Sequence, residues 1–242
     1  MSDKQGRLTG GKSGMLLAGA VGLLVGGGAI MLAQGGTGDG RTERIIRDYI
    51  LENPEIIPEA MERLQQREAA AAIGPRRAQL ETPYAGAWAG AADGDVILVE
   101  FFDYACGYCR ASNPVVERLL REDPRLKVVW RELPVLGPAS QEAAFMSLAA
   151  ADQNRFRQFH DALFALGPPS PETIARAQRA AGVQPAQSND AHRQELQRNM
   201  ELANLLRASG TPTFVVGDQV MHGAVGYERL KEAIEEARAG RS

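Results

Sequence analysis

The only two cysteines of this 242-residue chain stand three positions apart, with Gly107 and Tyr108 between Cys106 and Cys109. Residues 96–102, just before them, are rich in β-branched and aromatic side chains typical of a buried strand, and the residues after them have helical apolar spacing. The start of a helix stabilises a thiolate through its unpaired N–H groups and its partial positive charge. We therefore expect Cys106 to attack disulfides as a thiolate and Cys109 to resolve the mixed disulfide that forms.

Two other uses of the cysteine pair fit its spacing less well. Zinc requires four ligands, and the three histidines of the chain lie far from the pair in sequence, without a paired spacing of their own. A purely structural disulfide over so short a loop would stabilise the fold little, because the entropic gain grows with loop length. The pair thus favours redox chemistry over a metal site or a structural bridge.

Glu100 is an anomaly in the apolar strand, six residues before Cys106. A buried carboxylate costs free energy unless it has a partner or a chemical role. Burial would raise the pKa of Glu100, so that its carboxyl group could accept a proton from Cys109 or supply one to it. The alternative is that Glu100 lies at a strand edge and faces water.

A proline at the entry to a predicted strand is the second candidate feature. Gly210, Thr211 and Pro212 precede residues 213–216, and a two-residue Gly-Asp turn then leads into residues 219–221 as a hairpin. Proline in such a position suits a cis peptide bond in a tight corner. We therefore expect a cis bond before this proline.

The predicted elements follow the order strand, helix, strand, a long helical block, a hairpin and a last helix. Residues 96–102 and 127–133 flank one helix, which implies a parallel pair with a right-handed crossover. Residues 139–207 predict three or four helices, and residues 75–93 look irregular. The sequence thus predicts an α/β domain over residues 75–242, with an all-helical insertion at about 139–207.

An apolar stretch near the N-terminus has the length of a membrane span. Residues 14–33 carry no charged side chain, and they match the roughly 20 residues that a helix needs to cross the hydrocarbon core. The basic residues of the 1–13 tail precede it, so the positive-inside rule puts this tail in the cytoplasm and the rest of the chain in the periplasm. A cleaved signal peptide is the alternative. We expect an inner-membrane anchor, followed by a Gly-rich linker over residues 34–40.

Residues 41–74 predict a separate helical segment. Apolar residues around Tyr49 recur at helical spacing, Asn53 and Pro54 interrupt the pattern, and a second apolar stripe follows. Asn53 suits an N-cap and Pro54 a first helical position, so we expect the second helix to begin there. The apolar stripes either lie on the main domain or join copies of the chain into a homo-oligomer through residues 41–72.

The composition argues against several function classes. The net charge is −3, and no cluster of Lys and Arg with interleaved aromatic residues is present, so nucleic acid is not an expected partner. No Gly-rich phosphate-binding loop stands between a strand and a helix, so we expect no organic cofactor. The redox-active cysteine pair would itself carry the chemistry.

The cysteine pair and the proline loop together resemble a known family. Residues 99–109 (VEFFDYACGYC) resemble the active-site signature of DsbA-like thiol–disulfide oxidoreductases, which have a thioredoxin fold. Residues 211–214 are similar to the cis-proline loop of that family, and the helical block is similar to its inserted helical domain. The resemblance covers about residues 95–240. It implies Cys106 as nucleophile, Cys109 as resolving cysteine, Glu100 as buried proton-transfer residue, Thr211 and Pro212 as the substrate-binding loop, and exported proteins and a membrane redox partner as partners.

Two features set this chain apart from the strongest oxidants of that family. Gly107 and Tyr108 stand where those proteins have Pro-His, which implies a less oxidising potential. The same dipeptide, together with Thr211, is similar to periplasmic disulfide isomerases, and residues 49–55 resemble copper-sensitivity suppressor proteins, some of which oligomerise through that region. We expect an oxidase first, an isomerase or reductase second, and a thiol-based metal-binding or holdase module third.

Overall fold

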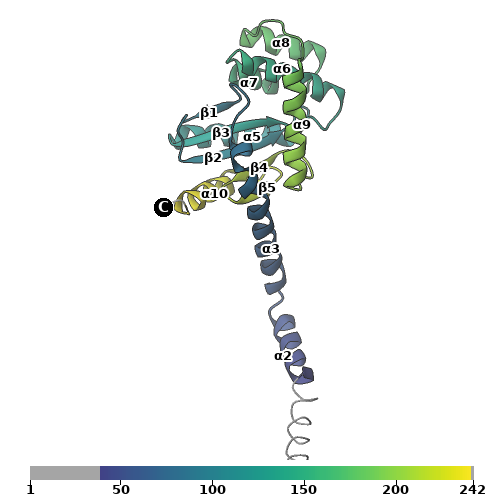
Figure 1. Ribbon diagram of the computed structural model, residues 1–242, viewed down its shortest axis with the longest axis vertical. Coiled ribbons are helices and arrows are strands. Elements are labelled where there is room, and N and C mark those ends of the chain that lie inside the picture. The colour runs from purple at the N-terminus through teal and green to yellow at the C-terminus, as the bar shows by residue number, and fades with distance from the viewer. Residues whose placement is uncertain (1–38, 241–242) are drawn as a thin grey trace, which may run out of the picture. The chain divides into compact units, whose positions relative to one another are not determined.

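The computed structural model describes residues 39–240 (Figure 1). The chain divides into two compact units, with the boundary between Glu62 and Arg63. The predicted cytoplasmic tail, the membrane anchor over residues 14–33 and most of the linker lie outside the described residues. Within residues 39–240, no helix combines the length and the apolar character that a membrane span requires.

The first unit contains α2 (Asp39–Glu52) and the start of α3 (Ile56–Ile73). The predicted break between these helices is present, but the predicted N-cap role of Asn53 is wrong. Its backbone N–H and its side-chain amide both donate to the carbonyl of Tyr49, each at 2.9 Å. The last carbonyls of a helix lack donors within that helix. Asn53 therefore closes the C-terminal end of α2, and α3 begins three residues later.

A five-stranded sheet forms the centre of the described part of the second unit, with the strand order β1-β3-β2-β4-β5. β2 and β3 are parallel, as predicted, and the other neighbouring strands are antiparallel. β4 and β5 form the predicted hairpin. The strands are β1 (Trp88–Gly90), β2 (Val96–Phe102), β3 (Leu126–Glu132), β4 (Thr213–Val216) and β5 (Gln219–His222).

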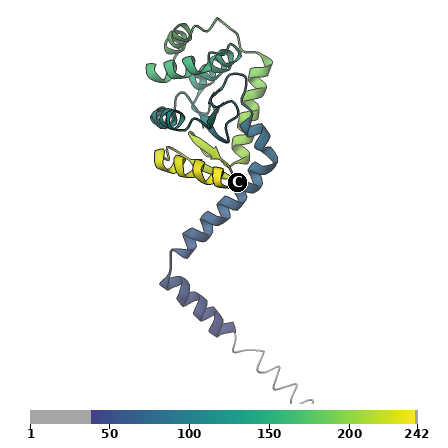
Figure 2. The ribbon, with the colours of Figure 1, turned by 90° about the vertical axis from the view of Figure 1, so that its left-hand side faces the viewer.

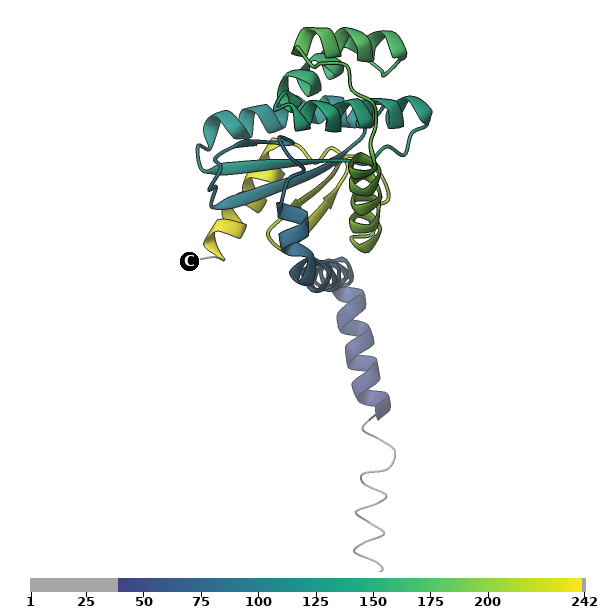
Figure 3. The same ribbon diagram turned by 45° about the horizontal axis from the view of Figure 1, so that its top comes forward.

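Helices cover both faces of this sheet, which confirms the predicted α/β architecture. Figure 3 shows the insertion helices α6, α7 and α8 stacked over the sheet, and Figure 2 shows the hairpin beside α10. One core contains side chains of α5 (Gly107–Glu122), α6 (Pro138–Asp152), α7 (Phe156–Leu166), α8 (Pro171–Ala181) and α10 (Tyr227–Ala239). A second core contains side chains of α4 (Arg77–Glu81), α9 (Asp190–Leu205) and the end of α3.

The alternation of side chains along β2 determines what lies behind the cysteine pair. Leu98 and Phe102 belong to the core under α5, α6 and α7, whereas Val99 and Phe101 belong to the core under α4 and α9. Glu100 has the parity of Leu98 and Phe102. Its carboxyl group therefore projects into the core that also contains both cysteines.

Residues 75–93, which we expected to be irregular, contain the helix α4 and the strand β1. Arg131 of β3 is buried and donates hydrogen bonds to the carbonyls of Leu80 at 3.0 Å and Thr82 at 2.7 Å. β1 in turn pairs antiparallel with β3. Partners distant in sequence order this segment, so its local composition gave no sign of the order.

Candidate active site

Cys106 lies between β2 and α5, as the N-cap residue of that helix. Its backbone is extended (φ −79°, ψ 118°), and Cys109 follows within the first turn of α5. Both cysteines are free thiols, and their exposed fractions are 6% for Cys106 and 0% for Cys109. The predicted position at a helix start is confirmed, and only the outer cysteine of the pair has contact with solvent. Tyr108 between them is 70% exposed.

The proline loop lies against the outer cysteine. The peptide bond between Thr211 and Pro212 is cis, as predicted. The Sγ atom of Cys106 donates a hydrogen bond of 3.1 Å to the carbonyl oxygen of Thr211, which is 105 residues away in sequence. The carbonyl of Pro212 accepts a bond of 2.8 Å from the N–H of Gly223, which ties the loop to the end of β5. The structure thus brings the two separate sequence motifs into one site.

Glu100 is fully buried on the central strand β2, so the alternative of an exposed strand edge is wrong. Its Oε2 atom accepts a hydrogen bond of 3.0 Å from the indole Nε1 of Trp130. Within the described residues, its Oε1 atom has no hydrogen-bond partner. Burial raises the pKa of Glu100 to about 8, although the bond from Trp130 acts in the opposite direction. This carboxyl group can therefore change its protonation near neutral pH.

Cys109 lies close enough to Glu100 to respond to its charge. Burial raises the pKa of the Cys109 thiol well above its ordinary value, and the negative charge of Glu100 raises it further. The inner cysteine therefore keeps its proton until a base removes it. Among the charged groups around Cys109, Glu100 has the largest effect on the pKa of its thiol. This arrangement can support proton transfer to and from the inner sulfur atom.

Asp103 fixes the loop that leads into the cysteine pair. Its side chain is buried, and Oδ1 accepts a hydrogen bond of 2.8 Å from the N–H of Ala105. Its Oδ2 atom accepts bonds from the N–H groups of Val135 at 2.9 Å and Leu136 at 3.0 Å. One carboxylate thus joins the loop before Cys106 to the loop after β3.

Two buried residues of β3 are part of the site but were not singled out from the sequence. Trp130 pairs in register with Glu100 and hydrogen-bonds its carboxylate. Glu132, at the end of the same strand, is also buried. A single charged residue on a predicted apolar strand is the signal that identified Glu100. Glu132 gave no such signal, because its predicted strand also carries Lys127 and Arg131. In the described part of the chain, no three His, Cys, Asp or Glu side chains gather as metal ligands would.

Comparison with known proteins places these features in a family context. A family described as DSBA-like thioredoxin domain matches residues 97–235, which is more than half of the chain. A second, described as Copper resistance protein ScsC N-terminal domain, matches residues 42–71. The chain spans about a quarter of the first curated relatives that it matches. It is 33% identical to the Na(+)/H(+) antiporter NhaA 1 of Salinispora arenicola over 159 residues, which are 62% of this chain and 24% of that protein.

Two solved structures share the fold over most of their length. A periplasmic thioredoxin-like protein from Salmonella enterica serovar Typhimurium is 29% identical, with a TM-score of 0.64, and the likeness covers 67% of this chain and 95% of that one. ScsC of Proteus mirabilis in a transitional conformation is 29% identical, with a TM-score of 0.67, and the likeness covers 84% of this chain and 97% of that one. Because the match over residues 97–235 includes the buried carboxylate, the cysteine pair and the cis-proline loop, this chain belongs to the DsbA-like thioredoxin-domain family of thiol–disulfide oxidoreductases.

Proposed function

We propose that this protein exchanges disulfides with exported proteins in the periplasm, with Cys106 as the nucleophile and Cys109 as the resolving cysteine. The observation that carries the proposal is the hydrogen bond of 3.1 Å from Cys106 Sγ to the carbonyl of Thr211. It brings the accessible sulfur atom against the cis-proline loop. A client segment that reacts with Cys106 would therefore lie along Thr211 and Pro212, whose backbone can bind it.

In the oxidase direction, a client thiolate attacks Sγ of Cys106 in the Cys106–Cys109 disulfide. The S–S bond of the enzyme breaks, a mixed disulfide forms at Cys106, and Cys109 leaves as a thiolate that takes up a proton. A second client thiolate attacks the client sulfur of the mixed disulfide and releases Cys106. The client loses two electrons, and the cysteine pair gains them.

Glu100 acts as the proton donor and acceptor for Cys109 in this scheme. The raised pKa of the Cys109 thiol favours protonation as soon as this sulfur leaves the disulfide. The pKa of Glu100, raised to about 8, lets its carboxyl group hold a proton at neutral pH and release it at little cost. The opposite transfer, from the thiol to the carboxylate, makes Cys109 a nucleophile when it resolves a mixed disulfide.

The oxidase direction is supported by contacts that stabilise the reduced enzyme. The Cys106 thiol donates a hydrogen bond to Thr211, and its sulfur lies at the N-terminal end of α5. Any interaction that stabilises the dithiol over the disulfide makes the disulfide a stronger oxidant. A membrane redox partner would then reoxidise the pair.

An isomerase or reductase is the second candidate, and the N-terminal helices favour it. An isomerase benefits from several active sites in one assembly, and α2 and α3 carry large apolar side chains that are exposed. We propose that these helices join copies of the chain into a homo-oligomer. The exposed side chains are Ile45, Ile46, Tyr49 and Leu51 on α2, and Ile57, Met61 and Leu64 on α3.

The proposed location is the periplasm, with residues 14–33 as an inner-membrane anchor. Two observations support it. The similar Salmonella protein is described as periplasmic. The apolar stretch 14–33 follows a basic tail, in the order that leaves the catalytic unit outside the cytoplasm.

The redox state of the cysteine pair in intact cells tests the proposed direction. Cells are quenched with acid, and free thiols are alkylated with a reagent that adds mass to each reduced cysteine. A mostly oxidised pair supports the oxidase, and a mostly reduced pair supports the isomerase or reductase. The matched variant Cys106→Ser should lose disulfide exchange in either case, and full activity in that variant would contradict the whole proposal.

A further inference from the structure

Glu132 is a second buried carboxylate on the sheet face that carries Glu100. It is the last residue of β3, its exposed fraction is 1%, and it stands in register with Phe102 of β2. Residues paired across neighbouring strands share a face, so Glu132 lies in the same layer as Phe102, Trp130 and Glu100. The proposed exchange reaction makes no use of it.

A chain of hydrogen bonds leads from Glu132 to the loop before the cysteine pair. The Ser147 hydroxyl of α6 donates to Oε1 of Glu132 at 2.8 Å. The Tyr104 hydroxyl lies 2.8 Å from Ser147 Oγ, and Nδ1 of His160 on α7 lies 3.4 Å from the Tyr104 hydroxyl. All four side chains are buried. These hydrogen bonds thus connect β3, the insertion helices α6 and α7, and the loop between β2 and α5.

The charge on Glu132 determines the direction of this chain. An ionised carboxylate can only accept, so Ser147 must donate to it. The Ser147 oxygen is then left to accept from the Tyr104 hydroxyl, and the Tyr104 oxygen to accept from Nδ1–H of His160. A protonated Glu132 can donate a hydrogen bond instead of accepting one. Protonation also removes the negative charge of Glu132, so the hydrogen bond between Ser147 and this carboxyl group becomes weaker. One proton at Glu132 therefore changes how firmly the Tyr104 hydroxyl is held.

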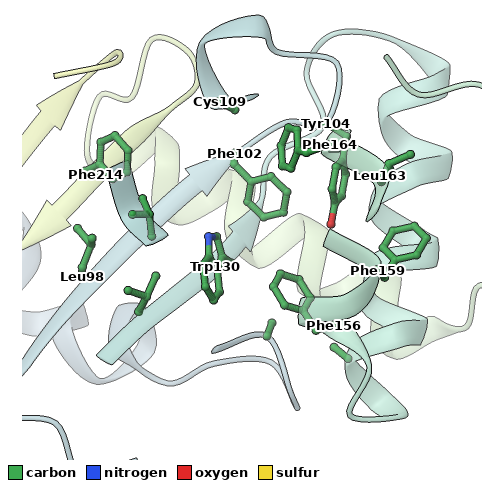
Figure 4. Packing of buried hydrophobic residues seen from close by; sticks show 14 of the residues in the cluster. Leu98, Phe102, Tyr104, Cys109, Trp130, Phe156, Phe159, Leu163, Phe164 and Phe214 are labelled. Carbon is green, nitrogen blue, oxygen red and sulfur yellow. The ribbon is translucent and has the colours of Figure 1, made fainter. Parts of the chain in front are cut away.

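Aromatic packing makes Tyr104 a rigid part of the loop. Figure 4 shows its ring among the aromatic side chains behind Cys109. The ring centroids of Phe102 and Phe164 each lie 4.9 Å from that of Tyr104. Tyr104 is only two residues before Cys106, and the N–H of Cys106 donates to the carbonyl of Asp103 at 3.0 Å. We therefore expect a change in the hydrogen bonding of the Tyr104 hydroxyl to alter the position of the backbone at Cys106.

We propose that Glu132 is a positioning residue that acts through Ser147 and Tyr104 on the loop presenting Cys106, and that it holds this loop more firmly when ionised. This inference rests on the proposed disulfide exchange, because it assigns a pH-dependent control to the same site. Burial is the main cause that raises the pKa of Glu132 to about 7, so its charge changes near neutral pH.

Glu132 is the one residue of this hydrogen-bond chain whose pKa lies near neutral pH. Glu195 of α9 raises the pKa of Glu132, and Arg131 lowers it. Burial keeps the pKa of Tyr104 well above its ordinary value, and Glu132 and Asp161 act in the same direction. Burial also holds the pKa of His160 well below its ordinary value, with Arg157 as the second cause.

The first readout is the resonance of the hydroxyl-bearing ring carbon of Tyr104, in the full chain labelled at that carbon and assigned by its absence in Tyr104→Phe. We expect the resonance to move with pH, with a midpoint near 7, and to stay flat in Glu132→Gln. Repeating the titration in Glu100→Gln removes the carboxyl group that titrates at about 8. A resonance that still moves with the same midpoint in Glu132→Gln, or that never moves, overturns the proposal.

The second readout is the rate at which the reduced protein attacks a small aromatic disulfide, from about pH 6 to about pH 8.5. We expect Glu132→Gln, Ser147→Ala and Tyr104→Phe to match the wild-type rate at the acidic end and to fall about three- to tenfold below it at the basic end, which is the difference between a hydrogen bond to a charged group and one to a neutral group. The double variant Glu132→Gln/Tyr104→Phe should fall no further than either single variant. Glu142→Gln, an exposed change on the same helix as Ser147, should follow the wild type throughout.

If the rate of each variant, divided by the wild-type rate, stays constant over this pH range, the role of Glu132 is merely structural and the proposal is overturned. Cys106→Ser separates this failure from a failure of the proposed function. If Cys106→Ser abolishes the reaction while the Glu132 ratios stay constant, disulfide exchange stands and only the positioning role is lost.

Discussion

The indole Nε1 of Trp130 donates a hydrogen bond of 3.0 Å to Oε2 of Glu100, so a neutral side chain partners the buried carboxylate of this site. A basic partner would supply a positive charge and hold the carboxylate ionised. The indole supplies only a hydrogen bond, which lowers the pKa of Glu100 less than burial raises it. The proton of Glu100 is therefore available near neutral pH, where the inner cysteine requires it.

Glu100→Gln should make the free energy of unfolding less dependent on pH. The carboxyl group has a pKa of about 8 in the folded chain, against its ordinary value of 4.5. Its contribution to stability is fully present below about pH 4.5 and is lost as the pH rises through 8, because the folded state must then hold a buried charge. From about pH 5 to about pH 9, the free energy of unfolding of the variant should therefore rise relative to that of the wild type by up to about 4 kcal/mol.

Urea denaturation of both proteins at the two pH values checks this prediction. Glu142→Gln is the control, since that glutamate is exposed. A stability difference between Glu100→Gln and the wild type that is equal at both pH values would contradict it.

Trp130→Phe should shift the protonation of Glu100 to a higher pH. Phenylalanine keeps an aromatic ring in the core but removes the only hydrogen-bond donor that Glu100 has within the described residues. That hydrogen bond lowers the pKa of Glu100, so its loss should raise the pKa above about 8 and destabilise the fold by about 1 to 3 kcal/mol at neutral pH. The carboxyl vibration in difference infrared spectra, with Glu100→Gln to assign the band, measures the shift. An unchanged midpoint would mean that the indole hydrogen bond has no influence on this proton.

The sequence was sufficient for features that depend on neighbouring residues. The cysteine pair at a helix start, the cis bond before Pro212 and the hairpin after it all follow from short local patterns. The pairing of Trp130 with Glu100 depends on the register between two strands 30 residues apart, which no local pattern contains. For the same reason, the sequence did not predict β1, whose three residues pair with β3. It also did not predict the hydrogen bonds that connect Glu132 to Tyr104 through Ser147.

Cys109→Ser should accumulate mixed disulfides between Cys106 and its clients. The outer thiol can still attack, because its access and its hydrogen bond to Thr211 do not involve the Cys109 sulfur. Without the inner sulfur, no second thiol of the enzyme can displace the client. Non-reducing gels of acid-quenched cells should show high-mass adducts that disappear on reduction. The double variant Cys106→Ser/Cys109→Ser is the control, and equal adducts in both variants would remove Cys106 from the role of nucleophile.

Ile46→Glu should weaken the proposed self-association without changing the chemistry of the cysteine pair. Ile46 is 53% exposed on α2, and Ile45 and Tyr49 on the same helix are similarly exposed. A charge among these side chains removes apolar area from an interface and must be desolvated when copies associate. We expect the mass measured by light scattering to fall to that of a single chain, while the exchange rate per cysteine pair stays within about twofold.

Arg44→Glu is the matched control for Ile46→Glu, because it puts the same residue on the opposite side of α2. It should leave the oligomer intact. If the wild type is already a single chain, the self-association proposal fails outright. If both variants dissociate equally, the effect comes from the added negative charge and not from the apolar face around Ile46.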